Sequence, residues 1–199
     1  MLKSLSLAVA VVGLAATLSA QTSPYPDTFK VNYFSNANCV EEPDGTVQIT
    51  NVGTQIGSKT APGGNLCALI YVFEPDQELA ECCGCKITPD GLLTLSIDNN
   101  LLSNTLTDVT VTSGVIKIVS SFASAGVCDP TKPVPATGVK AWATHIQGFF
   151  PPYSEFETET EFSDSNLSTG ELNRLTNECK GIASVGSGAG VCKCPGGPS

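Results

Sequence analysis

The chain has 199 residues and carries 19 acidic against 10 basic side chains, which gives a formal net charge of −9. Such a chain repels phosphate backbones and anionic lipid, and no cluster of Lys or Arg offsets the repulsion. The composition therefore argues against nucleic acid as a partner.

The first 20 residues predict a secretory signal peptide. They combine a basic start at Lys3, an apolar stretch and small residues before an expected cleavage after Ala20. The apolar core is short for a hydrocarbon layer of about 30 Å, so we expect no membrane contact after cleavage. Residues 21–199 are then predicted to form one secreted domain, extracellular or periplasmic.

Short stretches that are apolar or alternate in polarity predict a mainly β fold. Residues 45–53 alternate Val47 and Ile49 with polar neighbours, which is typical of a strand with one buried face. Residues 66–73 are continuously apolar and predict a strand that is buried on both faces.

Two further stretches predict hairpins, because each has turn residues between two strand-like runs. The turn residues are 89–91 within 85–98, and 113–114 within 108–122. The remaining expected strands are 139–150 and 153–162. About seven to eight short strands at regular spacing predict an antiparallel two-sheet sandwich.

One helix is predicted near the C-terminus, over about 168–181. Ser168 and Glu171 form a capping box at its start, and Gly181 is expected to end it. One apolar stripe follows the helix and faces the protein: Leu172, Leu175, Cys179 and Ile182. A Gly- and Ser-rich segment then leads to a tail with the last two cysteines.

Nine cysteines follow the signal peptide: Cys39, Cys67, Cys82, Cys83, Cys85, Cys128, Cys179, Cys192 and Cys194. Disulfides are expected because exported proteins meet oxidising conditions, and the odd count predicts one thiol that is free or joined to another molecule. Adjacent residues of an extended chain point to opposite sides. Cys82 and Cys83 could therefore reach two partners, Cys179 on the helix and either tail cysteine.

A metal-binding or redox function is the alternative to disulfides. Zinc needs about four ligands, and Cys82, Cys85, Cys192 and Cys194 have suggestive spacing. A thioredoxin-like site would need a helix after Cys85, where the sequence predicts a strand. Covalent haem would need histidine at position 86, which is Lys86. Disulfides are the favoured interpretation, and no cofactor is expected.

A hydrolase with acidic catalytic residues is the third hypothesis, and it is ranked last because no pattern in the sequence selects a catalytic set. His145 is the single histidine, and it points outward if Trp142 and Ile146 face the core. No nucleophile elbow occurs. Two acidic stretches predict solvated faces, one at Glu155, Glu157, Glu159 and Glu161 and one at Glu74, Asp76, Glu78 and Glu81.

Aromatic side chains at 148–156 are the best sequence candidate for contact with a partner. Phe149, Phe150 and Tyr153 surround two prolines, which favour an extended loop. Such rings could bind a sugar, a peptide or another subunit, or they could cap the end of the sandwich core.

Three stretches carry a resemblance to known proteins: CALIYVFEPDQELAECCGC, KITPDGLLTLS and GSGAGVCKC. They resemble uncharacterised secreted, cysteine-rich bacterial proteins over most of the mature chain. The resemblance implies export and transfers no activity or functional residue. The sequence thus predicts a secreted, disulfide-stabilised, non-catalytic protein that binds an extracellular ligand or self-associates.

Overall fold

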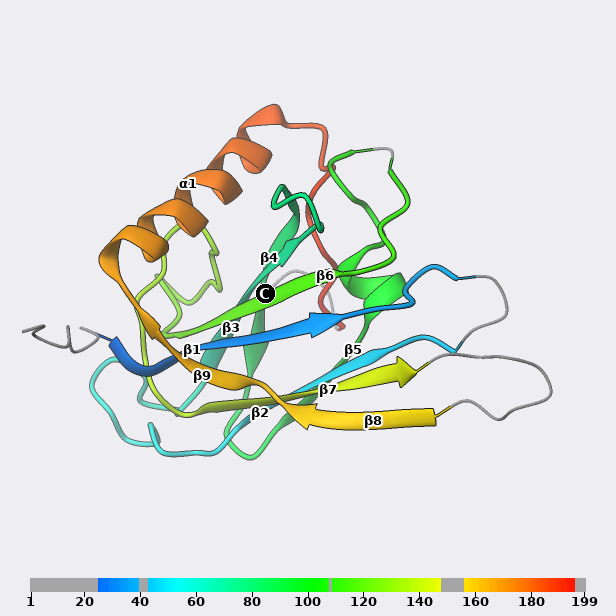
Figure 1. Cartoon of the computed structure of the whole chain (residues 1–199). Coiled ribbons are helices and arrows are strands. Elements are labelled where there is room, and N and C mark those ends of the chain that lie inside the picture. Colours follow the sequence, from blue (N-terminus) through cyan, green and yellow to red (C-terminus); the bar gives the residue numbers. More distant parts are fainter. Residues whose placement is uncertain (1–24, 40–42, 108, 148–155, 196–199) are drawn as a thin grey trace, which may run out of the picture.

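The computed structural model describes residues 25–39, 43–107, 109–147 and 156–195. It confirms a mainly β fold with two antiparallel sheets and one C-terminal helix (Figure 1). The described residues form nine strands, one more than the upper end of the predicted range. The strands are β1 (Tyr25–Phe34), β2 (Thr46–Asn51), β3 (Leu66–Phe73), β4 (Leu79–Ile87), β5 (Leu92–Ser96), β6 (Gly114–Ser121), β7 (Val139–Gln147), β8 (Phe156–Glu161) and β9 (Ser163–Leu167).

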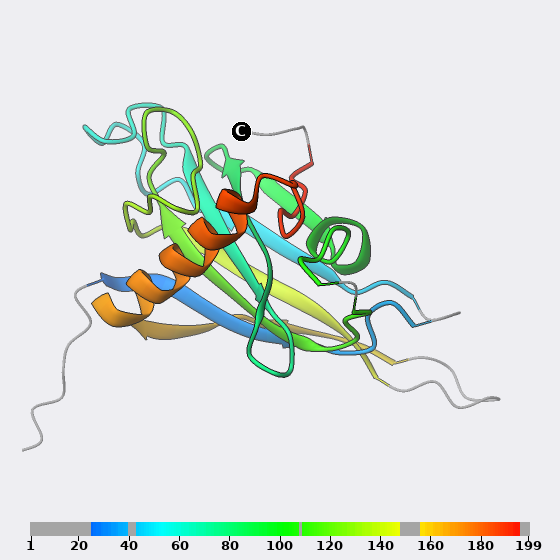
Figure 2. The ribbon, with the colours of Figure 1, turned by 90° about the horizontal axis from the view of Figure 1, so that it is seen from above.

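The two sheets share the strands unequally. The first sheet has the order β4-β3-β6-β1-β9 and the second the order β5-β2-β7-β8. The helix α1 (Thr169–Val185) lies across the first sheet, on the side away from the second (Figures 1 and 2). A π-helical turn, Ile97–Leu101, follows β5. Among the described residues, no helix has the length and apolar character needed to cross a membrane.

This three-layer arrangement creates two apolar cores. Between the sheets, β2 buries Val47 and Ile49, as its alternation predicts. Between the first sheet and α1, Leu69 and Tyr71 pack with Leu175. Every residue of β3 is buried, because the helix covers one face of this strand and the second sheet covers the other.

The start of α1 is predicted correctly, and its end is not. The Ser168 hydroxyl accepts a hydrogen bond of 3.1 Å from the Glu171 amide, which is the capping interaction expected. The helix continues past Gly181 and ends at Val185, before Gly186 in the left-handed conformation at φ 71°. Gly181 is exposed and has open space around it, so the helix passes through it without a steric conflict.

Neither predicted hairpin forms. The turn at 88–91 closes through the Gly91 amide and the Thr88 carbonyl, 2.9 Å apart, but the chain crosses between the sheets there. β4 pairs with β3, and β5 pairs with β2. Around 113–114, only the second half forms a strand, β6.

The stretch predicted as one strand at 153–162 also changes sheets. β8 pairs with β7 in the second sheet, and β9 pairs with β1 in the first. Phe162 lies between them and is buried in the core. The change of sheet lets one extended segment join the two layers.

Candidate functional site

Four disulfides join eight of the nine cysteines. The pairs are Cys67–Cys128, Cys82–Cys179, Cys83–Cys192 and Cys85–Cys194, with S–S distances of 2.00, 1.96, 1.96 and 1.99 Å. The ninth cysteine, Cys39, is half-buried. Three of the four bridges start from β4, so this single edge strand is the main cross-linked element.

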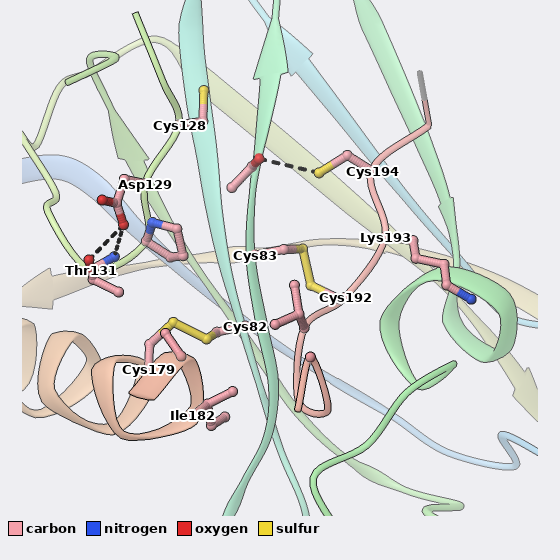
Figure 3. Close-up of a pocket in the computed structure, with 15 residues that line it drawn as sticks. Cys82, Cys83, Cys128, Asp129, Thr131, Cys179, Ile182, Cys192, Lys193 and Cys194 are labelled. Atoms are coloured by element: carbon pink, nitrogen blue, oxygen red, sulfur yellow. Dashed lines mark hydrogen bonds between the residues drawn. A yellow bond between two sulfur atoms is a disulfide. The ribbon is translucent and has the colours of Figure 1, made fainter. Parts of the chain in front are cut away.

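Side chains alternate between the two faces of β4, and this alternation sets the direction in which its three cysteines point. Cys82 points toward α1 and meets Cys179, which the apolar stripe of the helix presents to the sheet (Figure 3). Cys83 and Cys85 point to the opposite face and meet the tail. Alternation along a strand predicted this division between Cys82 and Cys83.

The tail lies along the open edge of β4. The Cys82 amide donates to the Gly190 carbonyl at 2.8 Å, and Cys82 forms a parallel bridge with Val191. The Lys193 amide donates to the Asn100 carbonyl at 2.9 Å, which anchors the tail on its other side. The tail thus covers backbone groups that an edge strand would otherwise expose.

A cavity of about 710 Å³ lies where α1, β4, the tail and the segment 128–131 meet (Figure 3). Each of the four disulfides contributes at least one sulfur-bearing residue to its wall. Much of the remaining wall is nonpolar, with Ile182, Ala183, Val191 and Pro130. The cross-links therefore converge on one cavity that is bounded by segments far apart in the chain.

Gly84 forms part of this wall and allows its close packing. A Cβ atom at this position would lie 1.9 Å from the carbonyl oxygen of Cys128, so no larger residue fits without moving the segment 128–131. The Tyr71 hydroxyl, which belongs to β3, donates to the Pro130 carbonyl at 2.7 Å and fixes the same segment to the first sheet. Burial raises the pKa of Tyr71, so the hydroxyl keeps its proton.

Polar groups in the wall come from Asp129, Thr131 and Lys193. The Asp129 carboxylate accepts from the amide and the hydroxyl of Thr131, at 2.9 and 2.6 Å, and pairs with Lys132 at 3.0 Å. Burial alone would raise the pKa of Asp129, but these hydrogen bonds and the charge of Lys132 together lower it. The cavity thus combines nonpolar walls with one fixed carboxylate and one exposed ammonium group.

The four-cysteine metal set predicted from spacing does not come together. Cys82 is bonded to Cys179 on the helix side of β4, whereas Cys85, Cys192 and Cys194 lie on the other side. The spacing could not show this, because it ignores the direction in which each side chain points. Among the described residues, the sulfurs of Cys83, Cys85 and Cys194 do gather within 4.8 Å of one another.

The prediction that His145 points outward is wrong. His145 is 2% exposed and stacks on Tyr33 with ring centroids 4.2 Å apart, while its Nε2 lies 2.7 Å from the Thr160 hydroxyl. Burial lowers the pKa of this histidine. The small residues Ala141 and Ala143 face the core instead of Trp142, which leaves room for the sheets to approach.

The two acidic stretches differ in exposure. Glu157, Glu159 and Glu161 are exposed, as expected, and Glu155 lies outside the described residues. The second stretch is only partly solvated, because Glu74 and Glu81 are 6% and 0% exposed. Phe149, Phe150 and Tyr153 also lie outside the described residues.

Sequence reasoning missed the role of Glu81. Its Oε1 accepts from the Asn104 amide at 2.6 Å, and Oε2 has no hydrogen-bond partner among the described residues. Burial raises the pKa of Glu81 to about 7, although the Asn104 amide and Lys193 act in the opposite direction. Glu81 does not line the cavity, so its perturbed pKa belongs to the packing of the tail and the 102–107 loop.

The sequence matches no family model, and no curated protein matches it. Among solved structures, the chain is similar to one described as "Crystal Structure of Thermotoga maritima 1070", from Thermotoga maritima. The identity is 13%, the TM-score is 0.42, and the match covers 72% of this chain and 97% of that chain. A likeness of this degree carries no argument about function.

Proposed function

We propose that this chain is a secreted, non-catalytic binding protein that holds a small, largely nonpolar ligand in the cavity between α1, β4 and the tail. The observation that carries the proposal is the convergence of all four disulfides on that cavity. Cross-links of this kind suit an oxidising exterior, and the signal-like first 20 residues supply the route to it.

The size and chemistry of the cavity suit a ligand site. Pockets for small molecules usually measure about 300–1,000 Å³ and combine nonpolar walls with a few fixed polar groups. Here the nonpolar part includes Ile182, Ala183 and Val191, and the polar part includes Asp129 and Lys193. A ligand with a nonpolar body and one polar or charged group would meet both kinds of wall.

Rigidity is the second physical support for binding. A site that must order its loops on binding loses affinity, whereas a preorganised site does not. The helix, the tail and the segment 128–131 are each covalently tied to the first sheet. The cavity wall therefore has little conformational freedom left to lose.

Filling the cavity tests the proposal. The Ala183→Trp variant places an indole at an exposed helix position that lines the cavity, so it should block binding without disturbing the core. We expect the wild type to bind the fluorescent probe 1-anilinonaphthalene-8-sulfonate, which has an aromatic body and one anionic sulfonate, saturably at one site. The variant should bind it at least about tenfold more weakly, a loss of about 1.4 kcal/mol.

Asn177→Trp is the matched control, because Asn177 is exposed on the same helix and does not line the cavity. It should bind the probe like the wild type. Equal binding by the wild type and Ala183→Trp, or no saturable binding by either, would show that the cavity is not a ligand site.

A further inference from the structure

Two disulfides lie side by side where the tail meets β4. Cys83–Cys192 and Cys85–Cys194 have the same sequence separation of 109, so the two segments are in register. Their Cα–Cα distances are 5.2 and 5.5 Å. Residues two apart on a strand lie about 6.6 Å apart and point to the same face. The four Cα atoms therefore form a near-rectangle with the sulfurs above it.

The sulfur atoms are already close to the arrangement of a metal site. Those of Cys83, Cys85 and Cys194 lie within 4.8 Å of one another, and the Cys192 sulfur lies 1.96 Å from that of Cys83. With a Zn–S bond of about 2.3 Å, the sulfurs of a tetrahedral site lie about 3.8 Å apart. Side-chain rotations that move each sulfur by about an ångström connect the two arrangements.

We propose that these four cysteines, when both bridges are reduced, form a tetrathiolate site for a soft divalent cation such as Zn²⁺. A dithiol supplies the electrons: at each bridge the S–S bond breaks, two protein thiols form, and the dithiol becomes a disulfide. The thiols release their protons as they bind the cation. The tail would then be fastened to β4 in both states, by sulfur–sulfur bonds or through the metal.

The fold separates these four cysteines from the others. Cys82 and Cys179 lie on the opposite side of β4 and cannot reach the same ion. Cys83, Cys85 and Cys192 are 5%, 1% and 5% exposed and Cys194 is half-buried, so a bound cation would be shielded from water on most sides. The inference does not depend on the cavity binding a ligand, since the metal set uses sulfur atoms and not the space beside them.

Cobalt binding tests the site on the full mature chain. The protein is reduced with a dithiol, separated from it without oxygen and titrated with Co²⁺. We expect one Co²⁺ per chain, with sulfur-to-cobalt charge-transfer bands that disappear when Zn²⁺ displaces the cobalt. The Cys192→Ser/Cys194→Ser variant should lose these bands, and the matched Cys67→Ser/Cys128→Ser variant should keep them.

Alkylation of the same samples gives a readout at each residue. Zn²⁺ should slow the reaction of Cys83, Cys85, Cys192 and Cys194 with iodoacetamide relative to the same reduced protein without metal. It should leave the reaction rates of Cys67 and Cys128, which are equally buried, unchanged. The proposal is overturned if the reduced protein shows no thiolate bands or if Cys192→Ser/Cys194→Ser retains them. It is also overturned if the bands persist in concentrated urea, because the ion would then bind an unfolded chain.

Discussion

Removing the disulfide with the shortest sequence separation should destabilise the protein most. Cys67–Cys128 spans 61 residues, against 97 for Cys82–Cys179 and 109 for each of the two tail bridges. We expect Cys67→Ala/Cys128→Ala to lower the free energy of unfolding by about 4 kcal/mol. The reason lies in the loop that each bridge closes while the other three remain.

The three bridges from β4 close chain loops that overlap almost completely, because each joins a residue of 82–85 to a residue of 179–194. With Cys83–Cys192 intact, Cys82–Cys179 closes a ring of only about 15 residues, and its removal should cost about 3 kcal/mol. Each tail bridge closes a ring of about six residues beside the other, and its removal should cost about 2 kcal/mol. No other bridge shortens the ring that Cys67–Cys128 closes.

Urea unfolding of the four paired Cys→Ala variants, under non-reducing conditions, measures this order. Paired substitution avoids leaving a single reactive thiol. A larger loss for either tail pair than for Cys67→Ala/Cys128→Ala would contradict the shared-loop explanation. It would mean that the tail bridges act mainly through packing in the native state.

The contribution of Glu81 to the stability of the protein should fall as the pH rises from about 4.5 to about 7. His145, whose pKa burial lowers, contributes in the opposite direction below about pH 6.5. Burial raises the folded pKa of Glu81 to about 7, above its ordinary value of 4.5. In that interval the folded protein keeps a proton that the unfolded chain releases, so the folded state is favoured at low pH and loses this advantage as the pH rises. The Glu81 contribution amounts to about 3 kcal/mol.

Glu81→Gln should remove this part of the pH dependence, because glutamine has the shape of the protonated acid and still accepts from the Asn104 amide. Above about pH 7 the variant should be more stable than the wild type by up to about 3 kcal/mol. Thermal unfolding across this pH range measures the effect, and Glu157→Gln, at an exposed position, is the control. A wild-type profile identical to that of Glu81→Gln would show that Glu81 ionises freely in the folded state.

The sequence predicted those features that depend only on residues close together in the chain. The alternation of Val47 and Ile49 fixed the buried face of β2, and Ser168 marked the start of α1. The adjacency of Cys82 and Cys83 predicted that they face different partners, which the pairs with Cys179 and Cys192 bear out. These inferences depend only on the period of a strand or on the cap of a helix.

Features that depend on distant partners were not predicted. The turn at 88–91 is visible in the sequence, but nothing local says that β5 joins β2 across the sandwich. Lys30 is 1% exposed because Asp27 and Asp164 neutralise its charge, and Asp164 lies on another strand. The cavity could not be predicted for the same reason, since four separated segments build its wall.

The pairing of the cysteines is the measurement that tests the central claim most directly, because the proposed site rests on the convergence of the four bridges on the cavity. Peptide mapping of the non-reduced protein, with partial reduction to resolve Cys82 from Cys83, gives the pairing. The structure predicts Cys67–Cys128, Cys82–Cys179, Cys83–Cys192 and Cys85–Cys194. Any bridge within the 82–85 cluster, or none between it and the tail, would contradict the claim.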